Sequence, residues 1–151
     1  MWAQGQLLKP TGAGYKNFPL PGANGIKVHA GVVYVTNTAT ETVLGISIRR
    51  GGDAGKITVR FRGIQGDDFA FAANGDMYIT ENPPSKLVRV TPAGRVYTVA
   101  TANDGLQNPS AAAFDPRPGR RTDLFITNSA YFGTRPSLQE LDVDEVGLRL
   151  R

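Results

Sequence analysis

Short apolar runs, separated by turn residues, make up most of this chain. Runs such as Val32–Asn37 and Thr42–Ile48 are rich in β-branched and aromatic residues, which favour strands. The 151 residues include 18 glycines and 10 prolines, and this frequent punctuation leaves almost no room for long helices. The pattern predicts an all-β fold.

The strand pattern repeats along the chain. The segments 24–28, 67–71 and 110–114 align with one another, and their starts lie 43 residues apart both times. Each is followed by a second run, in which an aromatic residue and a threonine recur in step. The aromatic positions are Tyr34, Tyr78 and Phe125, and the threonines are Thr36, Thr80 and Thr127. Third runs follow at 42–48, 86–90 and 137–141, and fourth runs at 56–61 and 95–99.

Four short antiparallel strands in each repeat are typical of a β-propeller blade. We therefore expect one half-domain over residues 1–151, with blades at about 22–64, 65–107 and 108–151. The segments 6–9 and 15–18 are interpreted as strands that complete a neighbouring blade, and the third repeat shows no clear fourth strand. A sandwich or a solenoid of the same hairpins is the alternative. Because a propeller closes with about four to eight blades, three would need a second copy or a missing N-terminal half.

Composition and charge argue against two classes of partner. The chain is 40% hydrophobic and 20% charged, which is enough apolar material for a core, and it lacks an apolar stretch long enough to span a membrane. The net charge of +4 comes from dispersed pairs such as Arg49-Arg50, without the clustered stripe that nucleic-acid binding needs. We expect neither a membrane nor a nucleic-acid partner. The start of the chain does not have the pattern of a secretory signal, and the absence of cysteine leaves the compartment open.

The repeats resemble the senescence marker protein and gluconolactonase-like family, which includes regucalcin-like proteins. Residues 21–26, Pro-Gly-Ala-Asn-Gly-Ile, are similar to the Asn-Gly motif of that family, and Gly66-Asp67 with the following residues is similar to its Asp-Gly motif. The segments 73–79 and 86–92 also look like its blade strands. The resemblance covers residues 21–150 and corresponds to the C-terminal half of a six-bladed propeller.

The resemblance implies a metal-dependent hydrolase of lactones or related esters. It implies that Asn24 and Asp67 are metal ligands and that Asp67 is also the catalytic general base. Oxygen ligands favour Ca²⁺, with Mg²⁺ or Zn²⁺ as alternatives. Two departures bear on this: Asp68 stands where the family has a glycine, and the family's glutamate ligand belongs to blades outside this chain.

The repeat itself indicates where small-molecule substrate contacts would lie. Equivalent positions before the first strands are expected to converge on the propeller axis, and equivalent positions at the ends of the second strands lie nearby. The expected substrate-binding residues are Glu81, Asn37, Asn128 and Ser110. Strand-end turns explain Asn24 and Asp67 about equally well, and hydrogen bonds between blades do so for the strand-end residues.

Three functions remain open from the sequence. The leading hypothesis is the lactone hydrolase, assembled as a homodimer of half-propellers. A non-catalytic binding or scaffold module is the second, and a metal-independent biosynthetic enzyme on the same fold is the third, because a fold does not fix its chemistry.

Overall fold

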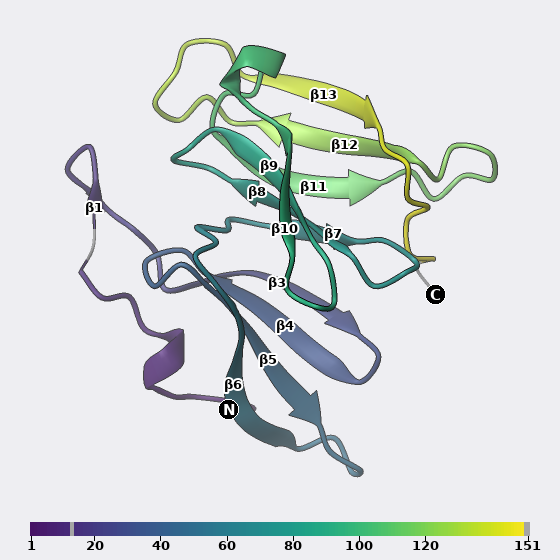
Figure 1. Ribbon diagram of the computed structural model, residues 1–151. Coiled ribbons are helices and arrows are strands. Elements are labelled where there is room, and N and C mark those ends of the chain that lie inside the picture. Colours follow the sequence, from purple (N-terminus) through teal and green to yellow (C-terminus); the bar gives the residue numbers. More distant parts are fainter. Residues whose placement is uncertain (13, 150–151) are drawn as a thin grey trace. The chain divides into compact units, whose positions relative to one another are not determined.

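The structure is a computed structural model that describes residues 1–12 and 14–149, and its elements follow one another as antiparallel strands (Figure 1). The chain divides into two compact units, Met1–Asp67 and Asp68–Arg151, and each is described by itself. Among the described residues, no helix has the length and apolar character needed to cross a bilayer.

The first unit contains a four-stranded antiparallel sheet in the order β3-β4-β5-β6. Its strands are β3 (Ala23–His29), β4 (Val32–Asn37), β5 (Thr42–Ile48) and β6 (Ala54–Arg62). Ala30 and Gly31 make the tight turn between β3 and β4, with φ angles of 48° and 73°. Positive φ at both central residues is typical of the hairpin turn whose twist matches that of its strands.

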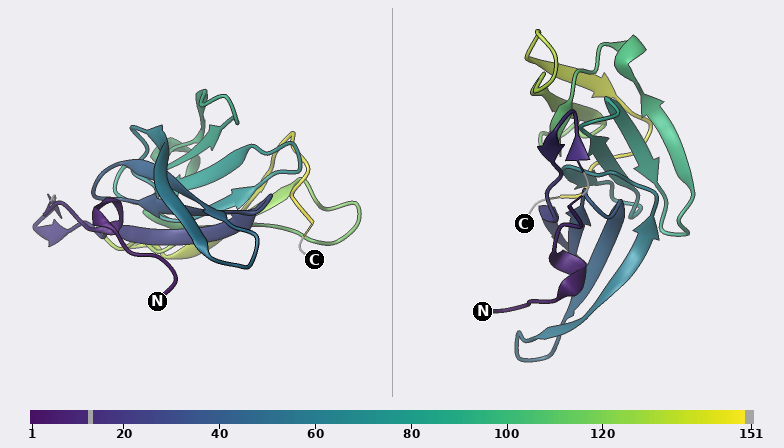
Figure 2. Two further views of the ribbon diagram at one scale, coloured as in Figure 1. Left: turned by 90° about the horizontal axis from the view of Figure 1, so that it is seen from below. Right: turned by 90° about the vertical axis from the view of Figure 1, so that its left-hand side faces the viewer.

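One face of this sheet is apolar across all four strands. Val33 and Val35 of β4 lie beside Leu44 and Ile46 of β5, and the paired positions on β6 are Ile57 and Val59. The N-terminal segment packs on this face through Ala3 and Leu8 (Figure 2). Partial burial of Ala3 and Leu8 helps to hold the segment against the sheet.

The segment 6–9 is a 3₁₀ turn, η1 (Gln6–Leu8), so the strand predicted there is wrong. The physical reason lies in Asn37, whose side-chain amide donates to the carbonyl oxygens of Leu7 and Lys9, at 2.9 and 3.0 Å. These bonds satisfy two carbonyl groups of the segment with a side chain of β4, where a strand would need a ladder partner.

The segment 15–18 forms a hairpin of its own. The strands β1 (Gly14–Tyr15) and β2 (Phe18–Pro19) pair with each other, with Lys16 and Asn17 at positive φ in the turn. The prediction of one strand across 15–18 is therefore wrong, because the turn at Lys16 and Asn17 reverses the chain in the middle of that segment.

The second unit contains two antiparallel sheets. The first has the order β10-β9-β8-β7, and its strands are β7 (Phe69–Phe71), β8 (Met77–Glu81), β9 (Lys86–Val90) and β10 (Val96–Ala100). After the short turn η2 (Ala102–Asp104) come β11 (Pro109–Phe114), β12 (Asp123–Asn128) and β13 (Ser137–Asp142). The core of this unit gathers Tyr78, Leu87, Leu106, Leu124 and Ile126, all fully buried.

The third sheet has three strands, which confirms for the described residues that the last repeat has no fourth strand. The chain after β13 returns instead toward β7, where Gly147 forms a bridge with Ala72 (Figure 1). The N–H of Leu148 donates to the Phe71 carbonyl at 2.9 Å, and the N–H of Ala73 donates to the Val146 carbonyl at 2.7 Å. The segment 146–148 therefore covers backbone groups that an edge strand would leave unpaired.

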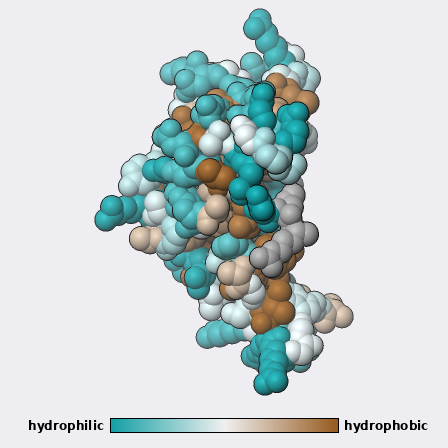
Figure 3. All heavy atoms as spheres, turned by 90° about the vertical axis from the view of Figure 1, so that its right-hand side faces the viewer, coloured by the Kyte–Doolittle hydropathy of each residue, from teal (hydrophilic) through white to brown (hydrophobic). Residues whose placement is uncertain are grey.

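Some large apolar side chains stay exposed on the strands. Ile26 and Val28 of β3 are 58% and 59% exposed, and Leu138 of β13 is 80% exposed. In the surface view of Figure 3, hydrophobic residues lie scattered among hydrophilic ones. Ile26 and Val28 share the sheet face of Val35 and Val33, because these residues pair directly across β3 and β4.

Candidate functional site

A bulge at the start of β3 determines where Asn24 points. The β3–β4 ladder pairs Ala23 with Asn37 and then resumes with Ile26 and Val35, so that Asn24 and Gly25 stand opposite Thr36 alone. A bulge of this kind twists the strand and changes the direction of a side chain. Asn24 leaves the sheet here and is exposed to solvent.

Thr36 is fully buried, and its hydroxyl holds this bulge. The hydroxyl accepts from the Gly25 N–H at 2.9 Å and donates to the Asp67 carbonyl at 2.6 Å. The Gly25 N–H also donates to the same Asp67 carbonyl, at 2.9 Å. Two donors, the Thr36 hydroxyl and the Gly25 N–H, therefore hold the Asp67 carbonyl beside the start of β3.

The side chains of Asn24 and Asp67 meet as a result. The Asn24 amide Nδ2 donates to Asp67 Oδ1 at 2.9 Å and contacts Thr38 Oγ1 at 3.2 Å. Thr38 in turn donates to the Gly66 carbonyl at 2.8 Å. The two residues predicted as metal ligands thus lie together within the first unit, at a point that solvent reaches.

An amide oxygen and a carboxylate are the ligand types that hard cations prefer. Asn24 and Asp67 therefore fit a divalent cation by their chemistry, with water or further oxygens needed to complete its shell. In the part of the chain that the structure describes, no three His, Cys, Asp or Glu side chains gather closely enough to hold a metal by themselves.

The same hydroxyl device recurs in the second unit. Thr80 is fully buried, accepts from the Asp68 N–H at 3.2 Å and donates to the Asp68 carbonyl at 3.0 Å. Asp68 follows Asp67 as Gly25 follows Asn24, so the two threonines serve equivalent positions. The sequence showed the recurring threonine, but the bulge it supports could not be seen without the strand register.

Ser110 is the third equivalent position and belongs to the second unit. It stands in a ladder irregularity between Pro109 and Ala111 of β11, and its hydroxyl donates to the Thr127 carbonyl at 3.4 Å. That Ser110 faces the same point as Asn24 and Asp67 stays a prediction.

Asn37 is fully buried at the end of β4. Besides its two bonds to the N-terminal segment, its Oδ1 accepts from the Thr40 N–H at 3.1 Å. The amide thus holds one loop and one terminal segment, as expected for hydrogen bonding between neighbouring elements. A substrate contact of Asn37 stays a prediction.

Asn128 and Glu81 end the corresponding strands of the second unit, and both are buried. The Asn128 amide accepts from the Gln107 N–H at 3.1 Å and donates to Ser137 Oγ and Gln139 Oε1 at 3.2 and 3.1 Å. Glu81 is at the last rung of the β8–β9 ladder, opposite Lys86. Their proposed contacts with substrate stay predictions as well.

A polar cluster that the sequence did not reveal joins the segment after β13 to the β10-β9-β8-β7 sheet. The Tyr78 hydroxyl donates to the Glu145 carboxylate, which also pairs with the Arg89 guanidinium, and Asp76 lies 3.7 Å from Arg89 Nε. Burial, and then the hydrogen bond with Glu145, raises the pKa of Tyr78. Tyr78 therefore stays protonated at neutral pH and can act only as a donor to Glu145.

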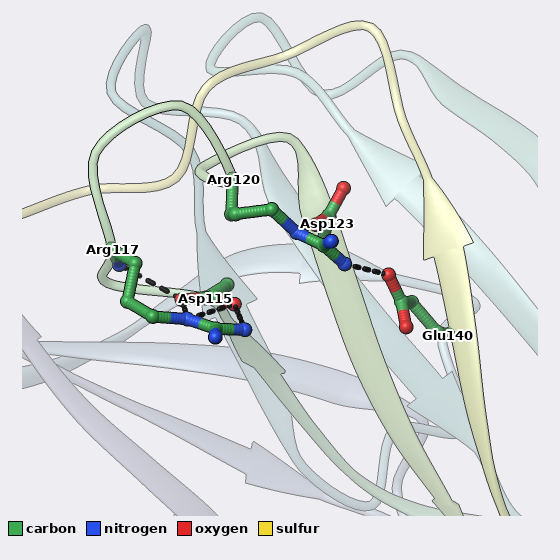
Figure 4. A network of polar contacts seen from close by, with 5 residues as sticks. All are labelled: Asp115, Arg117, Arg120, Asp123 and Glu140. Atoms are coloured by element: carbon green, nitrogen blue, oxygen red, sulfur yellow. Dashed lines mark hydrogen bonds and ion pairs between the residues drawn. The ribbon is translucent and has the colours of Figure 1, made fainter.

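A second ionic network lies at the β11–β12 turn and reaches β13 (Figure 4). The Arg117 guanidinium and its backbone N–H both donate to Asp115, and they lower the pKa of that carboxyl to about 2. Arg120 pairs with both Asp123 and Glu140. Because each carboxylate in this network has an arginine partner within it, we interpret the network as a structural one that stabilises the β11–β12 turn.

Comparisons with known proteins bear on the fold. No family model matches the sequence, and no curated protein matches it closely enough to count as a relative. Solved structures do match. A luciferin-regenerating enzyme superimposes with a TM-score of 0.69 at 10% identity, over 87% of this chain and 48% of its own. A calcium-binding protein, regucalcin from Agrobacterium tumefaciens, gives a TM-score of 0.61 at 19% identity, over 84% of this chain and 48% of its own.

A gluconolactonase from Xanthomonas campestris gives a TM-score of 0.54 at 18% identity, over 73% of this chain and 36% of its own. The sheets are β-propeller blades. The predicted all-β propeller fold, and the structural resemblance to gluconolactonase-like and regucalcin-like proteins, are thereby confirmed. The chain spans less than half the length of each of these three proteins, and identities this low establish the fold alone.

Proposed function

We propose that this chain contributes half of a propeller-type hydrolase site, which acts on a lactone or related ester with the help of a divalent cation. The observation that carries the proposal is the contact of 2.9 Å between the side chains of Asn24 and Asp67. Ca²⁺ is favoured over Mg²⁺ or Zn²⁺, because an amide and a carboxylate supply only oxygen ligands.

A bound cation would polarise the ester carbonyl and lower the pKa of a bound water. The chain itself would position the side chains of Asn24 and Asp67, and Asp67 would accept the proton that the attacking water releases. Asp67 is the proposed general base, since its side chain is only partly buried and lies where solvent reaches it. Thr36 and Gly25 keep the Asp67 backbone from moving while the carboxylate accepts that proton.

The proposal includes a second copy of the chain, which would complete the ring. The known propellers that match are more than twice as long as the matched part, so a ring of their size needs as much chain again. The exposed Ile26 and Val28 form an apolar part of a sheet face, of the kind that a partner blade would cover. An N-terminal half outside this sequence would serve the same purpose.

The cation is tested by calorimetric titration of Ca²⁺ into the wild type, Asp67→Ala and Asn24→Ala. Asp53→Ala is the matched control, because Asp53 is an exposed carboxylate of the same unit in the β5–β6 loop. We expect saturable heat for the wild type and the control and none for the two site variants. Equal heats in all four proteins would remove the metal site.

Turnover is tested separately, with a panel of γ- and δ-lactones assayed with and without EDTA. Loss of hydrolysis in EDTA and in Asp67→Ala would support the proposal. Native mass spectrometry at micromolar concentration tests the second copy. A folded monomer that still binds Ca²⁺ would overturn the dimer and leave the ligand pair in place.

A non-catalytic binding module is the second candidate. It is favoured by the small number of ligating side chains that gather among the described residues of the chain. Calcium binding without any EDTA-sensitive lactone hydrolysis, in a protein shown to be dimeric, would decide in favour of this alternative.

A further inference from the structure

A cavity of about 490 Å³ opens between the N-terminal segment and the ends of β5 and β6. Its lining comes from both sides, namely Gln6, Leu7, Lys9, Pro10 and Thr11 from the segment, and Thr40, Thr42, Val59 and Arg62 from the loop and the sheet. All of these residues belong to the first unit. The volume lies within the range of about 300–1,000 Å³ that is usual for small-molecule sites.

A bulge in β6 brings Arg62 to this cavity. Val59 pairs with Leu44, and Phe61 pairs with Val43, so Arg60 is the extra residue between two successive rungs. In a regular strand, Val59 and Arg62 would point to opposite faces, because they lie three residues apart and side chains alternate along a strand. The bulge places both on the face that the N-terminal segment covers.

The charge of the lining is uniformly positive. Lys9 and Arg62 are its two ionisable residues, and no Asp or Glu side chain lines it. Within the described parts of the chain, neither cation forms an ion pair. Two unpaired cations around one cavity favour an anionic ligand.

The hydroxyls of Thr40 and Thr42 add a donor. They share one hydrogen bond, at 2.8 Å, in which either can donate. Because two hydroxyl groups carry two protons, this bond uses one and leaves the other to donate to a ligand. Leu7, Pro10 and Val59 supply an apolar part of the same lining.

We propose that this cavity binds a small organic carboxylate, with the carboxylate on Arg62 and Lys9 and the hydrocarbon part against Leu7, Pro10 and Val59. Arginine is the cation best suited to a carboxylate, since its planar guanidinium donates two parallel hydrogen bonds. The site is separate from Asn24 and Asp67, and the proposal does not depend on hydrolase activity.

The test is a calorimetric titration of the full chain with sodium hexanoate at low ionic strength. Hexanamide is the neutral analogue, and inorganic phosphate is the anion without an apolar part. Variants Arg62→Gln and Lys9→Gln remove the two cations one at a time. Lys56→Gln of β6 and Arg50→Gln of the β5–β6 loop are matched controls, because both residues belong to the first unit and neither lines the cavity. Circular dichroism verifies that each variant is folded.

We expect saturable binding of hexanoate that is about tenfold weaker in Arg62→Gln and in Lys9→Gln, as for the loss of one charge-assisted hydrogen bond. The two controls should bind as the wild type does, and hexanamide and phosphate should bind more weakly than hexanoate. Equal binding of hexanamide or phosphate, an equal loss in the controls, or no saturable binding of hexanoate would each overturn the proposal.

Discussion

The hydroxyl of Thr36 is the contact on which the geometry of the candidate site most depends, and Thr36→Val removes it with little else. Valine has the same shape and the same preference for strands, so the backbone of β4 should be retained. The change takes away one donor to the Asp67 carbonyl and one acceptor for the Gly25 N–H. These two backbone groups keep only their bond to each other, at 2.9 Å.

Loss of a buried hydrogen bond of this kind costs about 1–2 kcal/mol of the free energy of unfolding. For a chain of this length, each kcal/mol lowers the melting temperature by about 2–4 °C, so we expect a fall of about 2–8 °C. Calorimetry in EDTA measures it without any contribution from a cation. The side-chain amide resonances of Asn24 should shift as well, because Asp67 Oδ1 is their acceptor.

The control is Thr58→Val on β6. Thr58 also donates its hydroxyl to a backbone carbonyl, that of Gly45 at 3.0 Å, but Thr58 is exposed and distant along the sheet from the bulge. We expect almost no change in melting temperature and none in the Asn24 resonances. If both valine variants melt alike and leave Asn24 unchanged, Thr36 does not hold the site.

Three further predictions concern supports of the fold. Asn37→Ala should lower the free energy of unfolding by about 2–3 kcal/mol and speed hydrogen exchange in the N-terminal segment, since a buried amide with three partners is lost. Asp115→Asn should destabilise the protein at neutral pH. The pKa of Asp115 is lowered in the folded state by Arg117, so its contribution is present above about pH 4 and is lost as the pH falls toward 2; urea titrations should therefore converge for the two proteins in acid, and a constant difference would contradict this. Gly147→Ala should accelerate proteolysis near the C-terminus, because a Cβ there would lie 2.3 Å from the Cβ of Phe114; unchanged cleavage would show that the segment is not held there.

Most strands could be predicted because their signal is local. The alternation and the turn residues alone place 32–37, 42–48, 86–90 and 123–128 as the structure has them. The strand predicted at 6–9 is wrong because the structure there depends on a distant residue. The apolar residues Leu7 and Leu8 suggested a strand. The side-chain amide of Asn37, distant in the sequence, instead binds the backbone of this segment and stabilises a 3₁₀ turn.

The sequence repeat predicted the two residues of the candidate site, but it did not predict the groups that position them. Asn24 and Asp67 stand at equivalent points of the repeat, which is visible in the sequence, and the structure brings their side chains together. The role of Thr36 depends on a bulge, and so does the position of Arg62. A bulge shifts the register by one residue, and a one-residue shift in a strand reverses every face assignment that follows it.

The composition of the Asn24 and Asp67 pair suggests why the two equivalent positions differ. Two aspartates at this separation would repel each other whenever no cation lay between them. An asparagine can donate its amide hydrogen to Asp67, as it does at 2.9 Å. The same side chain, turned about its last torsion, would present its oxygen to a cation. A pair of one amide and one carboxylate is therefore satisfied both with and without a cation, which two carboxylates could not be.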